Sequence, residues 1–275
     1  MSQKLMELSR CQYSYTPMLI VQISDTHISQ PNSREPHTLE RISVLRSFVK
    51  HVSDMEEVPD LILHTGDVSQ NGKPEEYEIV RSIMRDSNIP VFFALGNRDF
   101  DVNLAEGLKC LGGARLVNGF LIYSIEGYPV RLIAMDTQKR NDRVGTTCSV
   151  RLGVLEKMLK EQPDIPTAIF MHHPAFQVPT SKYPFQFSDT TAADALLHLV
   201  ERNEQIVQLF CGHMHRQFNV QLKTCNASIA PSLSSDNREG DYEPGLTKRP
   251  LFLTHRWKPN QRRFESQLVP VWCSI

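Results

Sequence analysis

The stretch Met18-Leu-Ile-Val-Gln-Ile-Ser-Asp-Thr-His27 decides the fold, because it joins an apolar run to side chains that can bind a metal ion. The run Met18–Ile23 is continuous enough to predict a buried strand. Directly after it come Asp25 and His27, a carboxylate and an imidazole two residues apart. Both groups are common metal ligands, although an isolated Asp-x-His pair is a weak signal.

Four other apolar runs along the chain end in comparable clusters. Residues 61–63 lead to Gly66-Asp67, residues 91–95 to Gly96-Asn97-Arg98-Asp99, residues 167–171 to His172-His173-Pro174, and residues 205–211 to Gly212-His213-Met214-His215. Ligands of α/β sheets bind beyond the carboxyl ends of the strands, so we expect these five loops to meet at one sheet edge. Their joint occurrence predicts a metal centre where each cluster alone would not.

The remaining sequence alternates between helical and extended patterns. Apolar spacings of three and four predict a helix within 36–54, Pro74 begins another, and further helices are expected at 149–161 and 190–202. Strands are expected at 120–125 and 130–135, and short strands with polar turns after Phe218. This alternation predicts an α/β fold in which helices cover two packed sheets. We expect residues 17–275 to form a single domain, residues 1–16 a loose tail, and 179–189 and 232–248 long loops.

Composition excludes several classes of function. The 275 residues carry 30 Lys and Arg against 31 Asp and Glu, a net charge of −1, which argues against a nucleic-acid partner. No apolar run is long enough for a membrane span, and the polar N-terminus lacks the features of a signal peptide, so we expect a cytoplasmic protein. The cysteines are widely spaced and are expected to be reduced thiols: Cys11, Cys110, Cys148, Cys211, Cys225 and Cys273.

The number and type of predicted ligands favour two metal ions over one. The seven ligands are Asp25, His27, Asp67, Asn97, His172, His213 and His215. They exceed what one transition-metal ion takes from protein, and a carboxylate can bridge two ions about 3.5–4 Å apart. Imidazole, carboxylate and amide oxygen together suit Mn, Fe or Zn. Cys211 lies on the predicted buried strand and is not expected to be a ligand.

These five blocks resemble those of the calcineurin-like metallophosphoesterase superfamily, and their flanking residues resemble its class III cyclic-nucleotide phosphodiesterases. The resemblance implies a four-layer αββα sandwich with a dinuclear metal centre. It implies that Asp25, His27, Asp67 and His215 hold the first metal, that Asp67 bridges, and that Asn97, His172 and His213 hold the second. We further predict that Asn97, Arg98 and His215 contact substrate and that Arg98, Asp99 and His173 are catalytic.

The same resemblance implies a phosphodiesterase that hydrolyses 3′,5′-cAMP or 2′,3′-cyclic nucleotides, through attack of a metal-activated hydroxide on phosphorus. One position departs from the family, because Arg98 stands where the third block usually has a histidine that can protonate the leaving group. Arginine stays charged and cannot donate that proton, but it can pair with phosphate oxygens. An ion pair of Arg98 with Asp99 or Asp101 is the alternative. His64, His173 or a metal-bound water could supply the proton instead.

Arg98 also supports a second interpretation. Gly-Asn-Arg-Asp followed by Phe100 is similar to the third block of the UDP-2,3-diacylglucosamine pyrophosphatases, whereas His172-His173-Pro174 is not similar to their fourth block. For such a lipid substrate an aromatic-rich stretch could form a lid, or it could simply pack: Phe176, Val178, Tyr183, Phe185 and Phe187.

Three further questions stay open at this point. A non-enzymatic scaffold is disfavoured because no ligand is missing from the five blocks, and a nuclease is disfavoured by the neutral charge. Asn226 and residues 234–238 could contact a base or ribose, or could be solvated loop. Pairing of C-terminal strands between two copies would give a homodimer.

Overall fold

The computed structural model describes residues 16–178 and 181–272, most of whose strands form two mixed sheets packed against each other. The first sheet has the order β13 (Arg263–Pro270), β12 (Leu251–Lys258), β1 (Met18–Ile23), β2 (Leu61–His64) and β3 (Val91–Phe93). The second has the order β10 (Phe218–Gln221), β11 (Asn226–Ile229), β9 (Ile206–Cys211), β8 (Thr167–Phe170), β7 (Arg131–Ala134) and β6 (Tyr123–Ile125).

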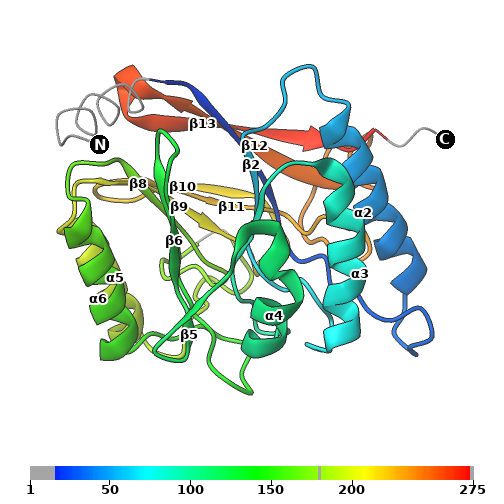
Figure 1. Cartoon of the computed structure of the whole chain (residues 1–275), viewed down its shortest axis with the longest axis horizontal. Helices are drawn as coiled ribbons and strands as arrows, with labels where there is room; N and C mark the ends of the chain where they lie inside the picture. The colour runs from blue at the N-terminus through cyan, green and yellow to red at the C-terminus, as the bar shows by residue number, and fades with distance from the viewer. Residues whose placement is uncertain (1–15, 179–180, 273–275) are drawn as a thin grey trace.

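Helices cover the outer faces of the two sheets, as the sequence predicts. Figure 1 shows α2 (Thr38–Ser53), α3 (Pro74–Met84) and α4 (Asp101–Gly112) on one side, and α5 (Ser149–Glu161) and α6 (Thr190–Glu201) on the other. One apolar core fills the space between the sheets and reaches under α2 and α3, and a second lies beneath α5 and α6. The predicted αββα sandwich is therefore confirmed.

Strand direction brings the predicted ligands to one edge of the sandwich. β1, β2 and β3 pair in parallel in the first sheet, and β7, β8 and β9 pair in parallel in the second. The two sets of carboxyl ends lie at the same edge, so the loops after β1, β2, β3, β8 and β9 meet there. Short backbone hydrogen bonds join these loops, such as those from the Asp25 nitrogen to the Gly66 carbonyl and from the Gly212 nitrogen to the His172 carbonyl, both 3.0 Å.

Helix α2 differs from its prediction in which residues face the core. Leu39 fits the apolar spacing from which this helix is predicted but is 68% exposed, whereas the charged Arg41 is buried beside Leu45 and Val49. Apolar spacing alone cannot show this exchange, because the reason for it lies in partners far along the chain.

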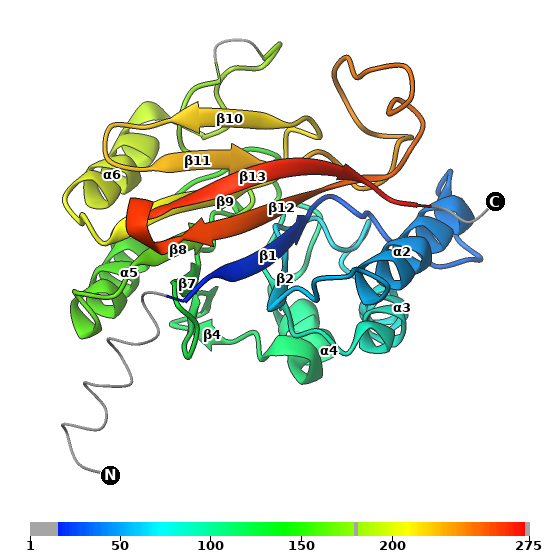
Figure 2. The ribbon, with the colours of Figure 1, turned by 90° about the horizontal axis from the view of Figure 1, so that it is seen from above.

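Three other features also differ from the predictions. Helix α4 was not predicted, although Leu104 and Leu108 lie one helical turn apart and are fully buried. The single strand expected at 120–125 is divided into β5 (Phe120–Leu121), which pairs with β4 (Leu116–Val117), and β6, which pairs with β7. The strands expected after Phe218 to be short include the eight-residue β12 and β13, which form a hairpin beside β1 (Figure 2).

Other predictions concern the cysteines, the membrane and the N-terminus. Cys110, Cys148, Cys211 and Cys225 are free, as expected, whereas Cys11 and Cys273 lie outside the described residues. Most of the predicted tail, residues 1–15, also lies outside them. Within 16–178 and 181–272, no helix has both the length and the apolar character needed to cross a membrane.

Candidate metal centre

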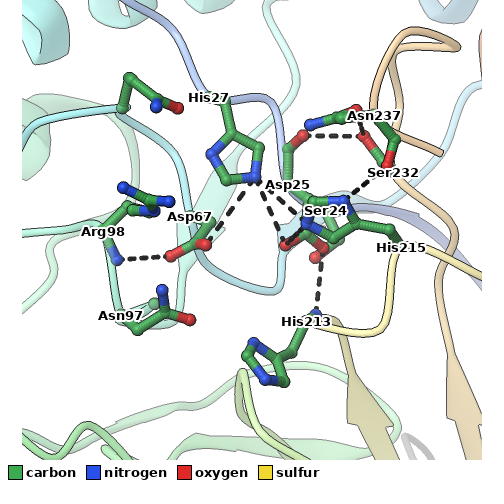
Figure 3. A network of polar contacts seen from close by, with 12 residues as sticks. Ser24, Asp25, His27, Asp67, Asn97, Arg98, His213, His215, Ser232 and Asn237 are labelled. Carbon is green, nitrogen blue, oxygen red and sulfur yellow. Dashed lines mark hydrogen bonds and ion pairs between the residues drawn. The ribbon is translucent and has the colours of Figure 1, made fainter. Parts of the chain in front are cut away.

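Three of the predicted ligands form a first cluster after β1 and β9. The Nε2 atom of His215 lies 3.2 Å from Oδ1 of Asp25 and 3.3 Å from Nε2 of His27. His27 Nε2 lies 3.9 Å from the same carboxylate oxygen. Figure 3 shows the three side chains pointing toward one another, so this cluster agrees with the ligand set predicted for the first metal.

A second cluster lies beside the first, at the ends of β3, β8 and β9. His172 Nε2 is 3.2 Å from the side-chain oxygen of Asn97 and 3.2 Å from Nδ1 of His213. His172 is fully buried, whereas Asn97 and His213 are partly exposed. These three residues are the ones predicted for the second metal.

Asp67 lies between the two clusters, with one carboxylate oxygen directed to each. Its Oδ2 is 3.8 Å from Nε2 of His27, and its Oδ1 is 3.6 Å from Nε2 of His172. The Oδ1 atom also accepts a 2.7 Å hydrogen bond from the backbone nitrogen of Arg98. This position between two sets of imidazoles is what a bridging carboxylate requires.

Five of the seven predicted ligands have a left-handed backbone. The φ angles are 55° for Asp25, 46° for His27, 51° for Asp67, 69° for His213 and 52° for His215. Such conformations are uncommon outside glycine and cost about 1–3 kcal/mol each, and Asp, Asn and His tolerate them better than most residues. Strands β1, β2 and β9 therefore each lead into a sharp turn that points polar side chains into the site, at a cost to stability.

Three of the four histidines in the clusters have the ring nitrogen that faces away from the site held by an acceptor. Nδ1 of His172 donates to the Thr65 carbonyl at 2.7 Å, and Nδ1 of His215 donates to the Asn237 carbonyl at 2.7 Å. Nε2 of His213 donates to the side-chain oxygen of Gln186 at 3.0 Å. Because the outer nitrogen donates to the protein, the inner nitrogen is the one that can bind a metal ion once its own proton has left.

A buried and unpaired carboxylate oxygen indicates that these residues can hold a cation. Oδ1 of Asp25 is completely buried, faces the imidazoles of both clusters, and has no hydrogen-bond partner in the described part of the chain. A buried carboxylate oxygen left in this state is costly. A cation at this point would supply the missing partner, and the nitrogen and oxygen donors around it suit a transition metal.

The pKa values of these side chains also indicate a site for cations. Burial lowers the pKa values of His172 and His215, but the charges of Asp25 and Asp67 outweigh it and raise both pKa values to about 9. Burial raises the pKa of Asp25, but the surrounding histidines outweigh it and hold that pKa well below its usual range. Burial lowers the pKa of His27 to about 4. Protons thus occupy the carboxylate-rich positions that metal ions would take.

Comparison with known proteins agrees with this geometry. The sequence profile of the calcineurin-like phosphoesterases matches residues 18–217, which contain all seven predicted ligands. The chain belongs to this family. It is therefore a metal-dependent phosphoesterase, and its clusters of buried His and Asp are consistent with a dinuclear site.

Similar proteins include phosphodiesterases of two kinds. The chain is 27% identical over 248 residues to a probable glycerophosphodiester phosphodiesterase from Arcobacter nitrofigilis, covering 89% of this chain and 90% of that relative. It is 27% identical over 219 residues to a 3′,5′-cyclic-nucleotide phosphodiesterase from Nostoc sp., covering 78% of each. A dimetal phosphatase from Danio rerio has the same fold, with a TM-score of 0.63 at 12% identity over 93% of this chain and 99% of that one.

The position at which this metallophosphoesterase departs from the usual third block lies at the rim of the site. Arg98 is partly exposed, and its guanidinium forms no ion pair within the described residues. The two carboxylates considered as its partners are engaged elsewhere, since Asp101 pairs with Arg140 at 2.6 Å and Asp99 accepts hydrogen bonds from backbone groups. The side chain is therefore free to meet an anion.

Asp99 is buried and its hydrogen bonds link the loops that carry the predicted ligands Asp67 and Asn97. Its carboxylate accepts from the backbone nitrogens of Val68, Ser69 and Gly96 at 3.0–3.2 Å and from the Tyr77 hydroxyl at 3.1 Å. Burial, followed by the charge of Asp67, raises its pKa to about 6. These contacts describe a residue that positions the loops, and its direct catalytic role stays a prediction.

The two histidines proposed as proton donors are both buried and hydrogen-bonded to protein. Nε2 of His173 donates to the Arg143 carbonyl at 3.1 Å, and its Nδ1 lies 3.0 Å from the Thr137 hydroxyl. Nε2 of His64 lies 2.9 Å from the Thr26 hydroxyl. Burial lowers the pKa of His173 well below its usual value, followed by the charges of neighbouring histidines. These contacts hold the His173 ring in place, and its catalytic role stays a prediction.

Several residues considered for substrate contact have other positions in the structure. Phe176, Val178 and Phe187 are at most 4% exposed and pack in the core beneath α6, which agrees with the packing alternative for these residues and not with a mobile lid. Only Tyr183 is prominently exposed, at 60%. Asn226 begins β11, at the end of that strand away from the ligand loops.

The loop at 232–248 supports the first cluster through its backbone. Arg238, considered as a base contact, instead donates to the carbonyl of Leu246 in the same loop and to that of Arg249 just after it, and its guanidinium lies over the Tyr242 ring. The loop thereby presents the Asn237 carbonyl to His215. The supporting residues Gln186 and Asn237 were not predicted individually, although both lie in loops whose length drew attention to them.

Proposed function

We propose that this metallophosphoesterase hydrolyses small phosphodiesters, with cyclic nucleotides and glycerophosphodiesters as the two substrate classes to test first. The observation that carries the proposal is the position of Asp67 between two clusters of candidate imidazole ligands, beside Arg98, whose guanidinium forms no ion pair within the described residues. The relatives named for these two substrate classes support the same reaction.

In the proposed site, Asp25, His27, Asp67 and His215 would hold one metal ion, and Asp67, Asn97, His172 and His213 would hold the other. Bound there, Mn, Fe or Zn ions would neutralise phosphate charge and lower the pKa of a water molecule. The protein's own contribution is orientation, because the fixed imidazoles and the bridging carboxylate determine where a phosphate can sit. The Arg98 guanidinium can pair with the phosphate oxygens and stabilise the charge that grows on them.

A second candidate function is hydrolysis of a nucleotide-sugar pyrophosphate. It is favoured by the absence of a histidine at position 98, because a phosphate leaves without the proton that a sugar alkoxide requires. The free Arg98 would suit the second phosphate of such a substrate as well. The two candidates therefore differ in leaving group and share the same metal centre.

A substrate panel on the manganese-loaded protein tests the proposal. We expect bis(4-nitrophenyl) phosphate and at least one natural diester among cAMP, 2′,3′-cAMP and glycerophosphocholine to be cleaved, with activity lost to a chelator. Arg98→Ala should raise KM or lower kcat, and Arg98→His should favour diesters with poor leaving groups. Cleavage of a UDP-sugar alone would transfer the assignment to the second candidate, and no metal-dependent cleavage of any of them would refute both.

A further inference from the structure

Arg41 is a charged residue buried on the apolar face of helix α2, only 8% exposed. Its Nε and Nη2 donate to Oδ2 of Asp236 at 3.0 and 2.6 Å, and its Nη1 donates to the His27 carbonyl at 3.3 Å. Asp236 is also almost completely buried, with 5% of its side chain exposed. Burying a charged pair is costly, and the pair recovers that cost only with good geometry, so a reason for placing it here is needed.

The two ends of this ion pair lead to the two histidines of the first cluster. On one side the guanidinium holds the carbonyl of His27 itself. On the other side Asp236 directly precedes Asn237, whose carbonyl accepts the 2.7 Å hydrogen bond from His215. The Glu239 nitrogen donates to the His215 carbonyl at 2.9 Å, so the same loop segment holds His215 by its ring and by its backbone.

His27 has a particular need for such support. His172, His213 and His215 each have their outer ring nitrogen held by an acceptor, but Nδ1 of His27 is buried without any partner in the described residues. What holds His27 is its left-handed backbone, whose nitrogen donates to the Asp67 carbonyl at 3.0 Å and whose carbonyl accepts from Arg41.

We propose that Arg41 is a positioning residue for the first metal site, acting on His27 directly and on His215 through Asp236. Through this contact the affinity of one metal site depends on the packing of α2 against the loop at 232–248. Within the described residues, neither Arg41 nor Asp236 is hydrogen-bonded to His172 or His213, whose rings are held by the Thr65 carbonyl and Gln186. This inference rests on the proposed metal assignment.

The proposal predicts a loss of metal affinity at one site only. Loss of an outer hydrogen bond to a ligand typically weakens metal binding 10–100-fold. To assign the effect, Mn²⁺ is titrated calorimetrically into the full chain in two backgrounds, His213→Ala, which keeps the first cluster, and His27→Ala, which keeps the second. Arg41→Met should weaken Mn²⁺ binding 10–100-fold in the His213→Ala background and leave it unchanged in the His27→Ala background.

Matched variants separate positioning from a general loss of stability. Arg131 is a suitable control, because it is 2% exposed and paired with Glu126 at 2.7 Å, on β7 away from the metal ligands. Arg131→Met should lower the melting temperature without changing Mn²⁺ affinity in either background. Arg41→Lys, which keeps the charge without the planar fork, should restore part of the lost affinity.

Defined results would overturn the inference. Unchanged affinity of Arg41→Met in the His213→Ala background would do so, and so would equal losses in both backgrounds or in the Arg131→Met control. Should Arg41→Met not fold, Asp236→Asn keeps the shape of the pair and must show the same site-selective loss. If the unmodified chain itself binds fewer than two Mn²⁺ ions, the proposed metal assignment fails first, and this inference fails with it.

Discussion

Replacement of Gly96 by alanine tests the position of the bridging carboxylate without changing any ligand. A Cβ atom at Gly96 would lie 2.0 Å from the backbone nitrogen of Asp67 and 2.3 Å from its Oδ1. Real Cβ atoms essentially never come within 3.0 Å of such neighbours. The backbone of Asp67 cannot rotate away as a side chain can, so the loop that carries Asp67 must move by about 1 Å.

The expected consequence can be given as a magnitude. A misplacement of about 1 Å in an active site costs roughly 10²-fold in rate. Overpacking a well-filled site also lowers the free energy of unfolding, typically by about 1–3 kcal/mol. We therefore expect Gly96→Ala to be folded, to melt at a lower temperature, and to hydrolyse bis(4-nitrophenyl) phosphate about 10²-fold more slowly at saturating Mn²⁺.

Gly153→Ala is the matched control for this variant. Gly153 lies in α5, and a Cβ there would meet nothing within 4 Å. Because glycine weakens a helix interior relative to alanine, this change should raise the free energy of unfolding by about 0.5–1 kcal/mol and leave kcat unchanged. A Gly96→Ala protein with wild-type kcat and two bound ions would refute the assignment of Asp67 as the bridge.

Three other predictions concern pH and the support of the second cluster. The pKa values of His172 and His215 are about 9 without metal, so a metal ion must displace their protons in order to bind. The affinity for Mn²⁺ should therefore fall about 10–100-fold for each pH unit below 8. Calorimetric titrations that show the same affinity at every pH would contradict this prediction. Burial lowers the pKa of His255 to about 3. Below pH 6.5 this histidine is therefore protonated in the unfolded chain but stays neutral in the folded chain, so the free energy of unfolding decreases as the pH falls toward 3. When the pH falls from 8 to 5.5, the free energy of unfolding measured with urea should decrease by about 1.4 kcal/mol less in His255→Gln than in the unmodified chain. Equal decreases in the two proteins would contradict a buried neutral histidine at this position. Gln186→Ala removes the acceptor that orients His213 and should lower the affinity for the second Mn²⁺ ion 10–100-fold. An unchanged affinity in calorimetric titrations would show that this contact does not support metal binding.

The fold class and the ligand blocks could be predicted because both depend on local sequence. An apolar run followed at once by Asp25 or His172 marks the end of a strand, and parallel strands bring such ends together. By contrast, α4 was missed because its interior Gly107 weakens the helical pattern, although its close approach to the Tyr77 side chain explains the glycine.

The supports of the site could not be predicted, because their partners are distant in the sequence. Arg41 and Asp236 are 195 residues apart, and Arg41 in an amphipathic helix looks like an ordinary exposed charge. The left-handed turns at Asp67 and His213 likewise depend on tertiary contacts, such as the 3.1 Å hydrogen bond from the His213 nitrogen to Asp25. Local pattern identifies the candidate ligands, whereas their alignment is a property of the folded chain.

Crystals of the manganese-loaded protein, measured for anomalous scattering at the manganese edge, would test the central claim most directly. Two peaks are expected about 3.5–4 Å apart, one on each side of the Asp67 carboxylate, the first among Asp25, His27 and His215 and the second among Asn97, His172 and His213. A single peak away from Asp67, or no peak after full supplementation, would contradict the dinuclear site and the phosphodiesterase mechanism built on it.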